Sequence, residues 1–247
     1  MSSGHWLALL LALSLASATV LAAPIWVGRF DPAQGELPLG WRIERPNPNA
    51  VPTRYRVRDW DGAAAVEARA ENSMALLARR LNIDLAATPV LCWRWRVDAP
   101  LKTADMTRKE GDDFAARVYL SFELPPEQLD FATRAGLAMA RLMHGDSLPD
   151  AAVNYVWDNR NPVGTWQANA YTAQARMLVL RSGAADAGRW VTERRDVGAD
   201  FQAAFGHAPL RLTGLAVASD TDNTGETAHA GFADFRFVGK DEECLRL

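Results

Sequence analysis

The feature that most constrains this chain is a succession of short segments with the alternation of β-strands, separated by Gly, Pro, Asn and Asp. Few helical stretches lie between them, which argues against alternating strand–helix units and a parallel sheet. The expected strands span 25–30, 54–59, 63–68, 73–82, 90–97, 114–124, 152–157, 177–182, 190–196, 211–219 and 232–238. This pattern predicts a mainly β fold, an antiparallel β-sandwich of jelly-roll type.

One longer stretch interrupts the strands with helical spacing. Between Pro126 and His144, small and apolar residues recur every three to four positions, and Gly145 follows as a stop signal. We therefore expect one inserted α-helix near residues 126–144, and a second, shorter helix from Gly198 to Phe205. An insertion of this kind more often covers a sheet edge, and a lid over the sheet is the alternative.

The charge balance excludes a common class of function. The chain has 27 Lys and Arg against 30 Asp and Glu, a formal net charge of −3, so it lacks the basic excess that binds a nucleic-acid backbone. With 49% hydrophobic and 23% charged residues, the composition is that of an ordinary globular protein.

The first residues differ in composition from the rest. No charge occurs from Leu7 to Ala23, and the run ends in small residues, which is typical of a cleavable secretory signal. An uncleaved anchor is the alternative, but the run barely reaches the roughly 20 residues that span a bilayer. We predict a signal peptide over 1–23 and one β-sandwich domain over 24–247, periplasmic or secreted and not held in the membrane after cleavage.

Two cysteines leave the question of a disulfide open. Export would permit a bond between Cys92 and Cys244. However, Cys92 falls within a strand pattern and Cys244 in a charged tail, which favours two unpaired thiols.

Alternation within two strands separates core from surface. In residues 91–97 the odd positions are apolar, whereas in 114–122 the even positions are apolar. Each strand therefore has a second face that carries polar residues, and neighbouring strands would join these faces in one patch. The residues of that expected patch are Arg94, Arg96, Asp113, Arg117 and Tyr119.

The first candidate site follows from two adjacent acids that lead into a strand. Asp112 and Asp113 precede the outward-facing Arg117 and Tyr119. The guanidinium fork of arginine suits carboxylate or sugar recognition. A cross-strand ion pair beside a turn explains the same residues without a ligand.

The second candidate is the oxygen-rich loop 219–226. Asp220 and Asp222 match the first and third positions of a calcium loop, but the twelfth position holds Gly231 instead of Glu. Two interpretations stay open. Asp220, Asp222 and Asn223 bind a ligand or Ca²⁺ in another geometry, or they form an Asx turn that satisfies its own backbone.

The third candidate is a group of aromatic residues beside Asn, Asp and Arg. Tyr155 and Trp157 precede the polar run 158–161, a combination that suits the apolar faces and hydroxyls of a carbohydrate. Both share parity with Val153, so a place in the core is the alternative for at least one of them.

No catalytic motif is complete in this chain. Gly-x-Ser-x-Gly, His-Glu-x-x-His and the dinucleotide and phosphate loops are all missing. A glycosidase needs two carboxylates about 5–10 Å apart. The acids at 112–113 and 220–222 are candidates for such a pair.

Four motifs occur in the order found in one bacterial family: 93–95 (WRW), 111–119 (GDDFAARVY), 154–157 (NYVW) and 219–225 (SDTDNTG). On these motifs the chain resembles the exported family called domain of unknown function 3047, from Phe30 to Phe237. The resemblance implies one exported domain without an established activity. The order of elements is also loosely similar to jelly-roll carbohydrate-binding modules, with 231–237 as the closing strand.

These observations favour an exported, non-catalytic module that binds a saccharide or another polar small ligand. The candidate ligand-binding residues are Asp112, Asp113, Arg117, Tyr119, Tyr155, Trp157, Asp220, Asp222 and Asn223. One alternative is a hydrolase that acts on a glycan or ester through carboxylates near Asp113 and Asp220. Another is a structural envelope protein whose polar sheet face docks a partner. No catalytic residue is assigned, and calcium is the one cofactor considered.

Overall fold

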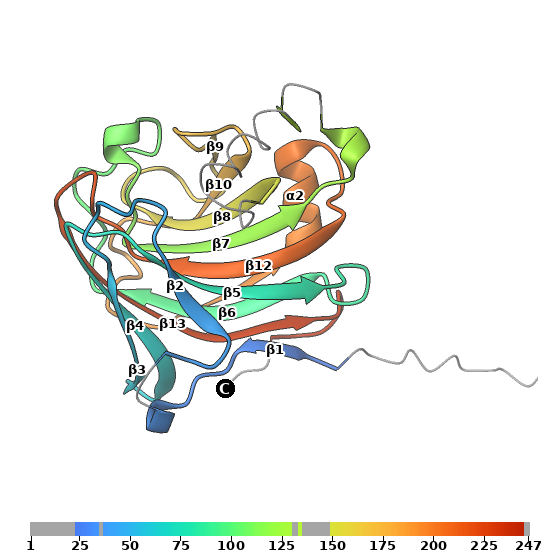
Figure 1. The fold of residues 1–247 in the computed structure, drawn as a ribbon. Helices are drawn as coiled ribbons and strands as arrows, with labels where there is room; N and C mark the ends of the chain where they lie inside the picture. The colour runs from blue at the N-terminus through green and yellow to red at the C-terminus, as the bar shows by residue number, and fades with distance from the viewer. Residues whose placement is uncertain (1–22, 35–36, 130–132, 135–148, 245–247) are drawn as a thin grey trace, which may run out of the picture.

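Two β-sheets pack face to face with an apolar core between them (Figure 1). This arrangement is seen in a computed structural model, which describes residues 23–34, 37–129, 133–134 and 149–244. The fold is therefore mainly β, and the predicted sandwich of jelly-roll type is confirmed. The predicted signal peptide lies outside the described residues, apart from its last position.

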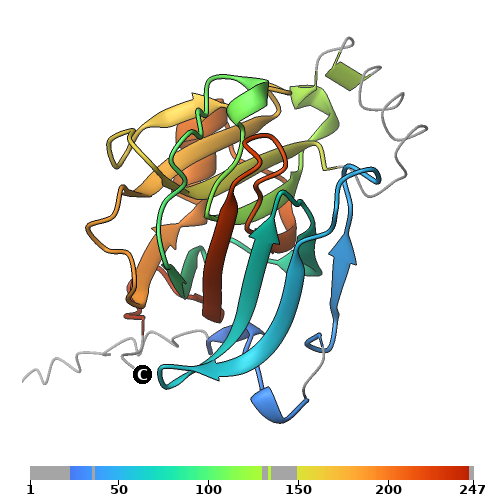
Figure 2. The ribbon, with the colours of Figure 1, turned by 90° about the vertical axis from the view of Figure 1, so that its left-hand side faces the viewer.

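Sheet A forms the lower layer in Figure 1. Its strands, in spatial order, are β11 (Val191–Asp196), β6 (Val90–Val97), β13 (Thr227–Val238), β4 (Ala63–Glu71) and β3 (Arg54–Trp60). A further strand, β1 (Ile25–Gly28), also pairs with β13. All pairs in this sheet are antiparallel, and Figure 2 shows β13 beside β4 and β3.

Sheet B forms the second layer. Its strands, in spatial order, are β2 (Trp41–Glu44), β5 (Leu76–Ile83), β12 (Arg211–Ala218), β7 (Ala116–Glu123), β8 (Ala151–Asp158), β10 (Ala175–Ser182) and β9 (Trp166–Ala168). Only the pair β8–β10 is parallel among the described strands.

Short helices connect the strands. The described 3₁₀ turns are η1 (Pro32–Gln34), η2 (Lys109–Gly111) and η3 (Pro126–Gln128). Helix α2 (Val197–Phe205) confirms the shorter predicted helix and packs against β6, β8 and β11 at one end of the core. It begins where the Asp196 carboxylate accepts a hydrogen bond from the Ala199 amide, and it ends at Gly206, whose φ of 81° favours glycine. No helix among the described residues is long and apolar enough to cross a membrane.

The predicted helix over 126–144 falls largely outside the described residues. Within that range the structure describes η3, Leu129 and a helical pair of residues at 133–134. Phe201 of α2 contacts Phe122 of β7, with ring centroids 4.6 Å apart.

Aromatic rings from both sheets meet at the centre of the core. The rings of Trp93 and Tyr155 are stacked 5.3 Å apart, and those of Trp95 and Trp157 lie 5.7 Å apart. These residues come from β6 and β8, one strand of each sheet. The alternation read from the sequence is confirmed, since the odd positions of 91–97 and the even positions of 116–122 are buried in this core.

The prediction of a polar patch that joins residues 94–96 to residues 113–119 is wrong. β6 and β7 do not pair, because they belong to the two facing sheets. Their apolar sides face each other, so their polar sides point to opposite surfaces of the sandwich. Arg94 pairs with Asp234 and Arg96 with Asp61 on sheet A, far in the fold from Arg117 on sheet B.

The cysteines form a disulfide, which corrects the expectation of two free thiols. Cys92 and Cys244 are bonded, with their Cα atoms 5.8 Å apart. β13 pairs with β6, so the tail that follows β13 starts beside the strand that carries Cys92. Arg194 of β11 holds this tail by donating hydrogen bonds to the carbonyls of Lys240 and Glu242. The charged tail is therefore fastened to sheet A, which its composition did not reveal.

Candidate functional site

Four of the predicted site residues converge at one end of sheet B. The Arg117 guanidinium binds Asp220 with two hydrogen bonds, 2.5 Å from Nη2 to Oδ2 and 3.2 Å from Nε to Oδ1. It also donates to the Asp112 carbonyl oxygen and lies 3.4 Å from the Asp112 carboxylate. Arg117 stands on β7 and Asp220 directly follows β12, its neighbour in the sheet. We call Asp112, Asp113, Arg117 and Asp220 the Arg117 cluster.

The acids of this cluster tie together loops that are distant in the sequence. Asp113 accepts hydrogen bonds from the backbone amides of Asn223 and Thr224, at 3.0 and 2.6 Å, and from the Asn223 side chain at 3.0 Å. Asp112 accepts one from Asn169 at 2.7 Å. The 112–113 segment therefore holds the 223–224 turn and the loop before β10 in place.

The Arg117 cluster is buried and dominated by acids. The exposed fraction is 0% for Asp113 and 2% for both Arg117 and Asp220. Burial raises the pKa of Asp220 well above its usual range, and Asp113 and Asp112 raise it further, against the effect of Arg117. Asp112 Oδ1 is buried without a hydrogen-bond partner, 3.4 Å from Arg117 Nη2. The other carboxylate contacts of the cluster join Arg117 to Asp220 and Asp113 to the 223–224 turn, so they hold the loops at this end of sheet B together.

The Asp222 carboxyl lies at the edge of this cluster. Partial burial and the nearby Asp113 raise its pKa. In the described part of the chain, no group of three or more His, Cys, Asp or Glu side chains is arranged to hold a metal ion. The oxygen-rich loop instead supplies Asp220 to Arg117 and the Asn223 amide to Asp113.

The aromatic candidates lie inside the protein. Tyr155 and Trp157 point into the core between the sheets and are fully buried. The Tyr155 hydroxyl donates to Asp200 at 2.7 Å, and the Trp157 indole donates to the Gly183 carbonyl at 3.0 Å. Their polar atoms thus have partners within the core.

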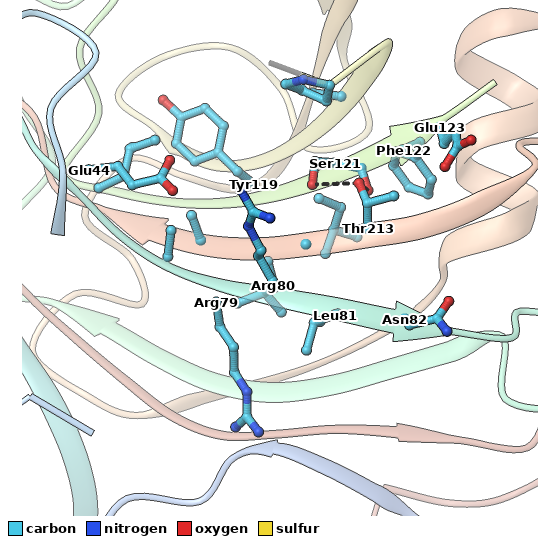
Figure 3. Close-up of a pocket in the computed structure, with 18 of the residues that line it drawn as sticks. Glu44, Arg79, Arg80, Leu81, Asn82, Tyr119, Ser121, Phe122, Glu123 and Thr213 are labelled. Carbon is cyan, nitrogen blue, oxygen red and sulfur yellow. Dashed lines mark hydrogen bonds between the residues drawn. The ribbon is translucent and has the colours of Figure 1, made fainter. Parts of the chain in front are cut away.

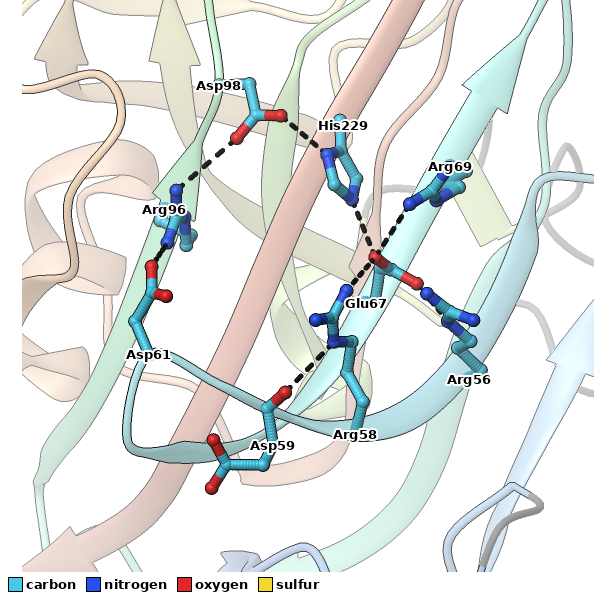
Figure 4. A network of polar contacts seen from close by, with 9 residues as sticks. All are labelled: Arg56, Arg58, Asp59, Asp61, Glu67, Arg69, Arg96, Asp98 and His229. Atoms are coloured by element: carbon cyan, nitrogen blue, oxygen red, sulfur yellow. Dashed lines mark hydrogen bonds and ion pairs between the residues drawn. The ribbon is translucent and has the colours of Figure 1, made fainter. Parts of the chain in front are cut away.

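A second ionic cluster lies on the outer face of sheet A (Figure 4). Glu67 of β4 has an exposed fraction of 1% and accepts hydrogen bonds from Arg56, Arg58 and Arg69. His229 Nε2 lies 2.8 Å from the same carboxylate. Burial alone would raise the Glu67 pKa, but the surrounding hydrogen bonds outweigh it and hold the pKa well below its usual value.

Glu67→Gln is expected to lower the free energy of unfolding by about 2 kcal/mol, because it removes the charge that balances three guanidinium groups. The Glu67 pKa is depressed in the folded state. Its stabilisation is therefore present above the unfolded value near 4.5 and is lost as the pH falls below it. Urea unfolding at pH 7 and pH 3 should show a difference between wild type and variant that shrinks in acid.

Glu71→Gln is the matched control for this prediction. Glu71 pairs with Arg54 on the same two strands, but the side chains are 60% and 67% exposed. An exposed pair contributes less than about 1 kcal/mol. Equal losses of stability at the two positions would contradict the role assigned to Glu67.

The open surface of sheet B contains a groove of about 660 Å³ (Figure 3). Side chains from β2, β5, β12, β7 and β8 line it. Of the predicted site residues only Tyr119 belongs to this lining. The Arg117 guanidinium lies 5.6 Å from the centre of the Tyr119 ring, so the Arg117 cluster also positions the aromatic side chain of the groove.

The polar side chains of the groove divide into paired and unpaired groups. Two ion pairs stand in its lining, Arg42–Glu44 and Arg211–Glu123, each with a closest distance of 2.5 Å. Ser121 Oγ and Thr213 Oγ1 share a hydrogen bond of 3.2 Å, drawn in Figure 3. Arg80 is an exposed member of the same lining.

The sequence reasoning missed most of this groove. Arg80, Ser121 and Thr213 come from β5, β7 and β12, whose adjacency is not local in the chain. The available signal was alternation. Residues 78, 80 and 82 share a face of β5, as 119 and 121 share a face of β7.

The fold and the groove define the class of this protein, a β-sandwich with an open polar groove along one sheet. The chain belongs to DUF3047, a family of proteins of unknown function, whose sequence model matches residues 39–236. The resemblance found in the sequence motifs is thereby confirmed. No curated protein matches the chain.

Solved structures with a similar arrangement include three glycan-degrading enzymes. A meso-active thermostable cellulase derived from Cel12A of Rhodothermus marinus has a TM-score of 0.43 and 12% identity, covering 87% of this chain and 100% of that one. The xyloglucanase domain of NopAA from Sinorhizobium fredii, in complex with cellobiose, has a TM-score of 0.42 and 8% identity, covering 81% and 93%. Trichoderma harzianum endoglucanase 3, of family GH12, has a TM-score of 0.40 and 8% identity, covering 90% and 99%.

Proposed function

We propose that this protein is an exported, non-catalytic module that binds a saccharide, or a ligand of similar polarity, in the groove of sheet B. The observation that carries the proposal is the groove itself, an open channel of about 660 Å³ across five strands with both polar and apolar walls. Pockets in which a few polar groups converge are the usual places of ligand binding.

The chemistry of the lining suits a polyhydroxylated ligand. Ser121, Thr213 and Asn82 supply hydroxyl and amide groups that donate and accept hydrogen bonds. Ala78 and Ala216 keep part of the floor low and apolar, so that a ligand can approach the sheet closely. A sugar presents this same combination of hydroxyls and apolar C–H faces.

Two observations favour binding over hydrolysis. Of the three carboxylates in the groove lining, Glu44 and Glu123 are each paired with an arginine, and Asp150 is buried and bonded to the Leu124 amide. Asp113 and Asp220, on which a hydrolase mechanism would depend, are buried and bonded inside the protein. A pair of carboxylates that acts as acid and base must reach the substrate.

The disulfide supports the exported location. Disulfides form and persist in oxidising compartments such as the bacterial periplasm. The Cys92–Cys244 bond therefore agrees with the secretory signal expected over residues 1–23.

Ala78→Trp is expected to weaken saccharide binding by about tenfold or more, because the indole would occupy the groove floor between β2 and β12. Binding is measured by affinity electrophoresis and calorimetry. The probes are xyloglucan, dextran, polygalacturonate and alginate.

Thr192→Trp provides the control, since Thr192 is exposed on β11, on the other sheet. It adds the same side chain and should leave binding unchanged. Absence of binding by the wild type to every probe would overturn the proposal, and so would equal weakening by the two tryptophan variants.

A further inference from the structure

We infer that the saccharide bound in the groove is acidic, and that Arg80 binds its carboxylate. The inference rests on the proposed function and adds the chemical class of the ligand. It follows from the charges of the groove and from the position of one guanidinium group among them.

Within the described part of the chain, Arg80 is the charged side chain of the groove without a partner of opposite charge. Arg42 and Arg211 are neutralised by Glu44 and Glu123. Among the described residues Arg80 makes no ion pair or side-chain hydrogen bond, and its own side chain is exposed. Figure 3 shows it extending from β5 into the groove, on the side where Tyr119 lies.

The other charged side chains near the groove do not cancel Arg80. Arg79 turns the opposite way, where its Nη1 donates to the Val27 carbonyl at 2.6 Å. Asp150 is buried, and its carboxylate accepts a hydrogen bond from the Leu124 amide at 2.9 Å. Counted over the described residues, the open part of the groove therefore has one uncompensated positive charge.

A single guanidinium group matches a single carboxylate in both charge and shape. Its planar fork donates two parallel hydrogen bonds to the two oxygens of a carboxylate. Ser121 and Thr213 stand in the same groove and provide partners for the hydroxyls beside that carboxylate. A uronic acid unit carries this set of groups on one ring.

Calorimetry on the mature, disulfide-bonded protein tests the inference. The probes are oligomers of galacturonate, of alginate uronates and of methyl-esterified galacturonate, which has the same backbone without the charge. The protein should bind at least one of the two acidic oligomers. If it binds galacturonate, methyl esterification should weaken binding by about tenfold to a hundredfold.

Arg80→Gln should weaken binding of the acidic oligomer to a similar degree, about tenfold or more, and should remove the preference over the neutral ligand. Arg54→Gln makes the same change of charge on sheet A, where Arg54 pairs with Glu71, and should leave binding unchanged. Unchanged thermal unfolding of Arg80→Gln would show that the groove is intact.

The outcomes separate the inference from the function on which it rests. If neutral and acidic oligomers bind equally and only Ala78→Trp abolishes binding, the groove binds saccharides but the carboxylate assignment is wrong. If a sulfated polysaccharide binds through Arg80 and uronates do not, the assignment is also wrong. If no saccharide binds, both the proposed function and the inference fail.

Discussion

Arg117→Met is expected to lower the free energy of unfolding by about 4 kcal/mol, because it leaves the buried Asp220 carboxylate without its cation. The Asp112 carbonyl loses a donor at the same time. Methionine fills much of the space of the arginine stem, so the loss reports on charge and hydrogen bonding. The measurement is urea unfolding at pH 7, followed by tryptophan fluorescence.

The pH dependence of this variant follows from Asp220. Burial already raises the Asp220 pKa in the folded protein, and removal of Arg117 takes away the group that opposes this rise. The folded variant then binds a proton more readily than the unfolded chain, so its stability should increase as the pH falls from 7 towards the unfolded value near 3.8. The deficit relative to wild type should shrink over this range.

Two further variants serve as controls for the Arg117→Met measurement. Arg108→Met breaks a pair between an exposed arginine and the half-buried Asp105 in the same region and should cost less than about 1 kcal/mol. Arg117→Met combined with Asp220→Asn should recover part of the lost stability, because the buried charge is gone. A loss at Arg117 no larger than that at Arg108 would show that the Arg117 cluster does not hold the loops.

The faces of individual strands could be predicted because alternation is a local property. Each residue of 91–97 points to the opposite side from its neighbour, so the apolar residues alone indicate the buried side. The sheet to which a strand belongs depends on pairing with distant segments. That information is missing from the alternation, so alternation alone does not tell whether β6 and β7 lie side by side. In the structure they face each other across the core.

For the candidate site too, local motifs could be predicted from the sequence, whereas burial and contacts between distant strands could not. In the sequence the motifs at 112–117 and 220–223 are two separate candidate sites, and the structure brings Arg117 and Asp220 together across 103 residues of sequence. Their burial could not be predicted, because it depends on the loops that cover that end of sheet B. Arg80 and Thr213 belong to no recognisable sequence motif. They become candidate binding residues only because β5, β12 and β7 place them in one groove.

The aromatic motif shows why residue type is a weak guide to exposure. Tyr155 and Trp157 stand beside polar residues in the sequence, as in many sugar-binding surfaces. Their alternation with Asn154 and Val156 places them on the inner face of β8, where Tyr155 stacks on Trp93 and the tilted rings of Trp157 and Trp95 lie 5.7 Å apart. The parity shared with Val153 was the better signal.

Removal of the Cys92–Cys244 disulfide is expected to lower the free energy of unfolding by about 4–5 kcal/mol. The bond joins positions 152 residues apart, so one covalent loop encloses β7, β8, β9, β10 and β12 of sheet B together with β11, β13 and most of β6 of sheet A. A loop of this length strongly restricts the unfolded chain, and chain-entropy arguments place the largest stabilisation there. Urea unfolding of the oxidised protein and of the Cys92→Ala, Cys244→Ala variant measures the difference.

Two further measurements distinguish an effect of the disulfide on the unfolded chain from damage to the folded state. If the disulfide acts on the unfolded chain, the variant should bind saccharide in the groove with the affinity of the oxidised protein wherever it remains folded. Its unfolding should also show a steeper dependence on urea, because an unconstrained chain exposes more surface. Equal stability with and without the bond would contradict the prediction. A loss of binding would instead indicate that the tail shapes the folded protein, although Cys244 lies on the outer side of sheet A and the groove on sheet B.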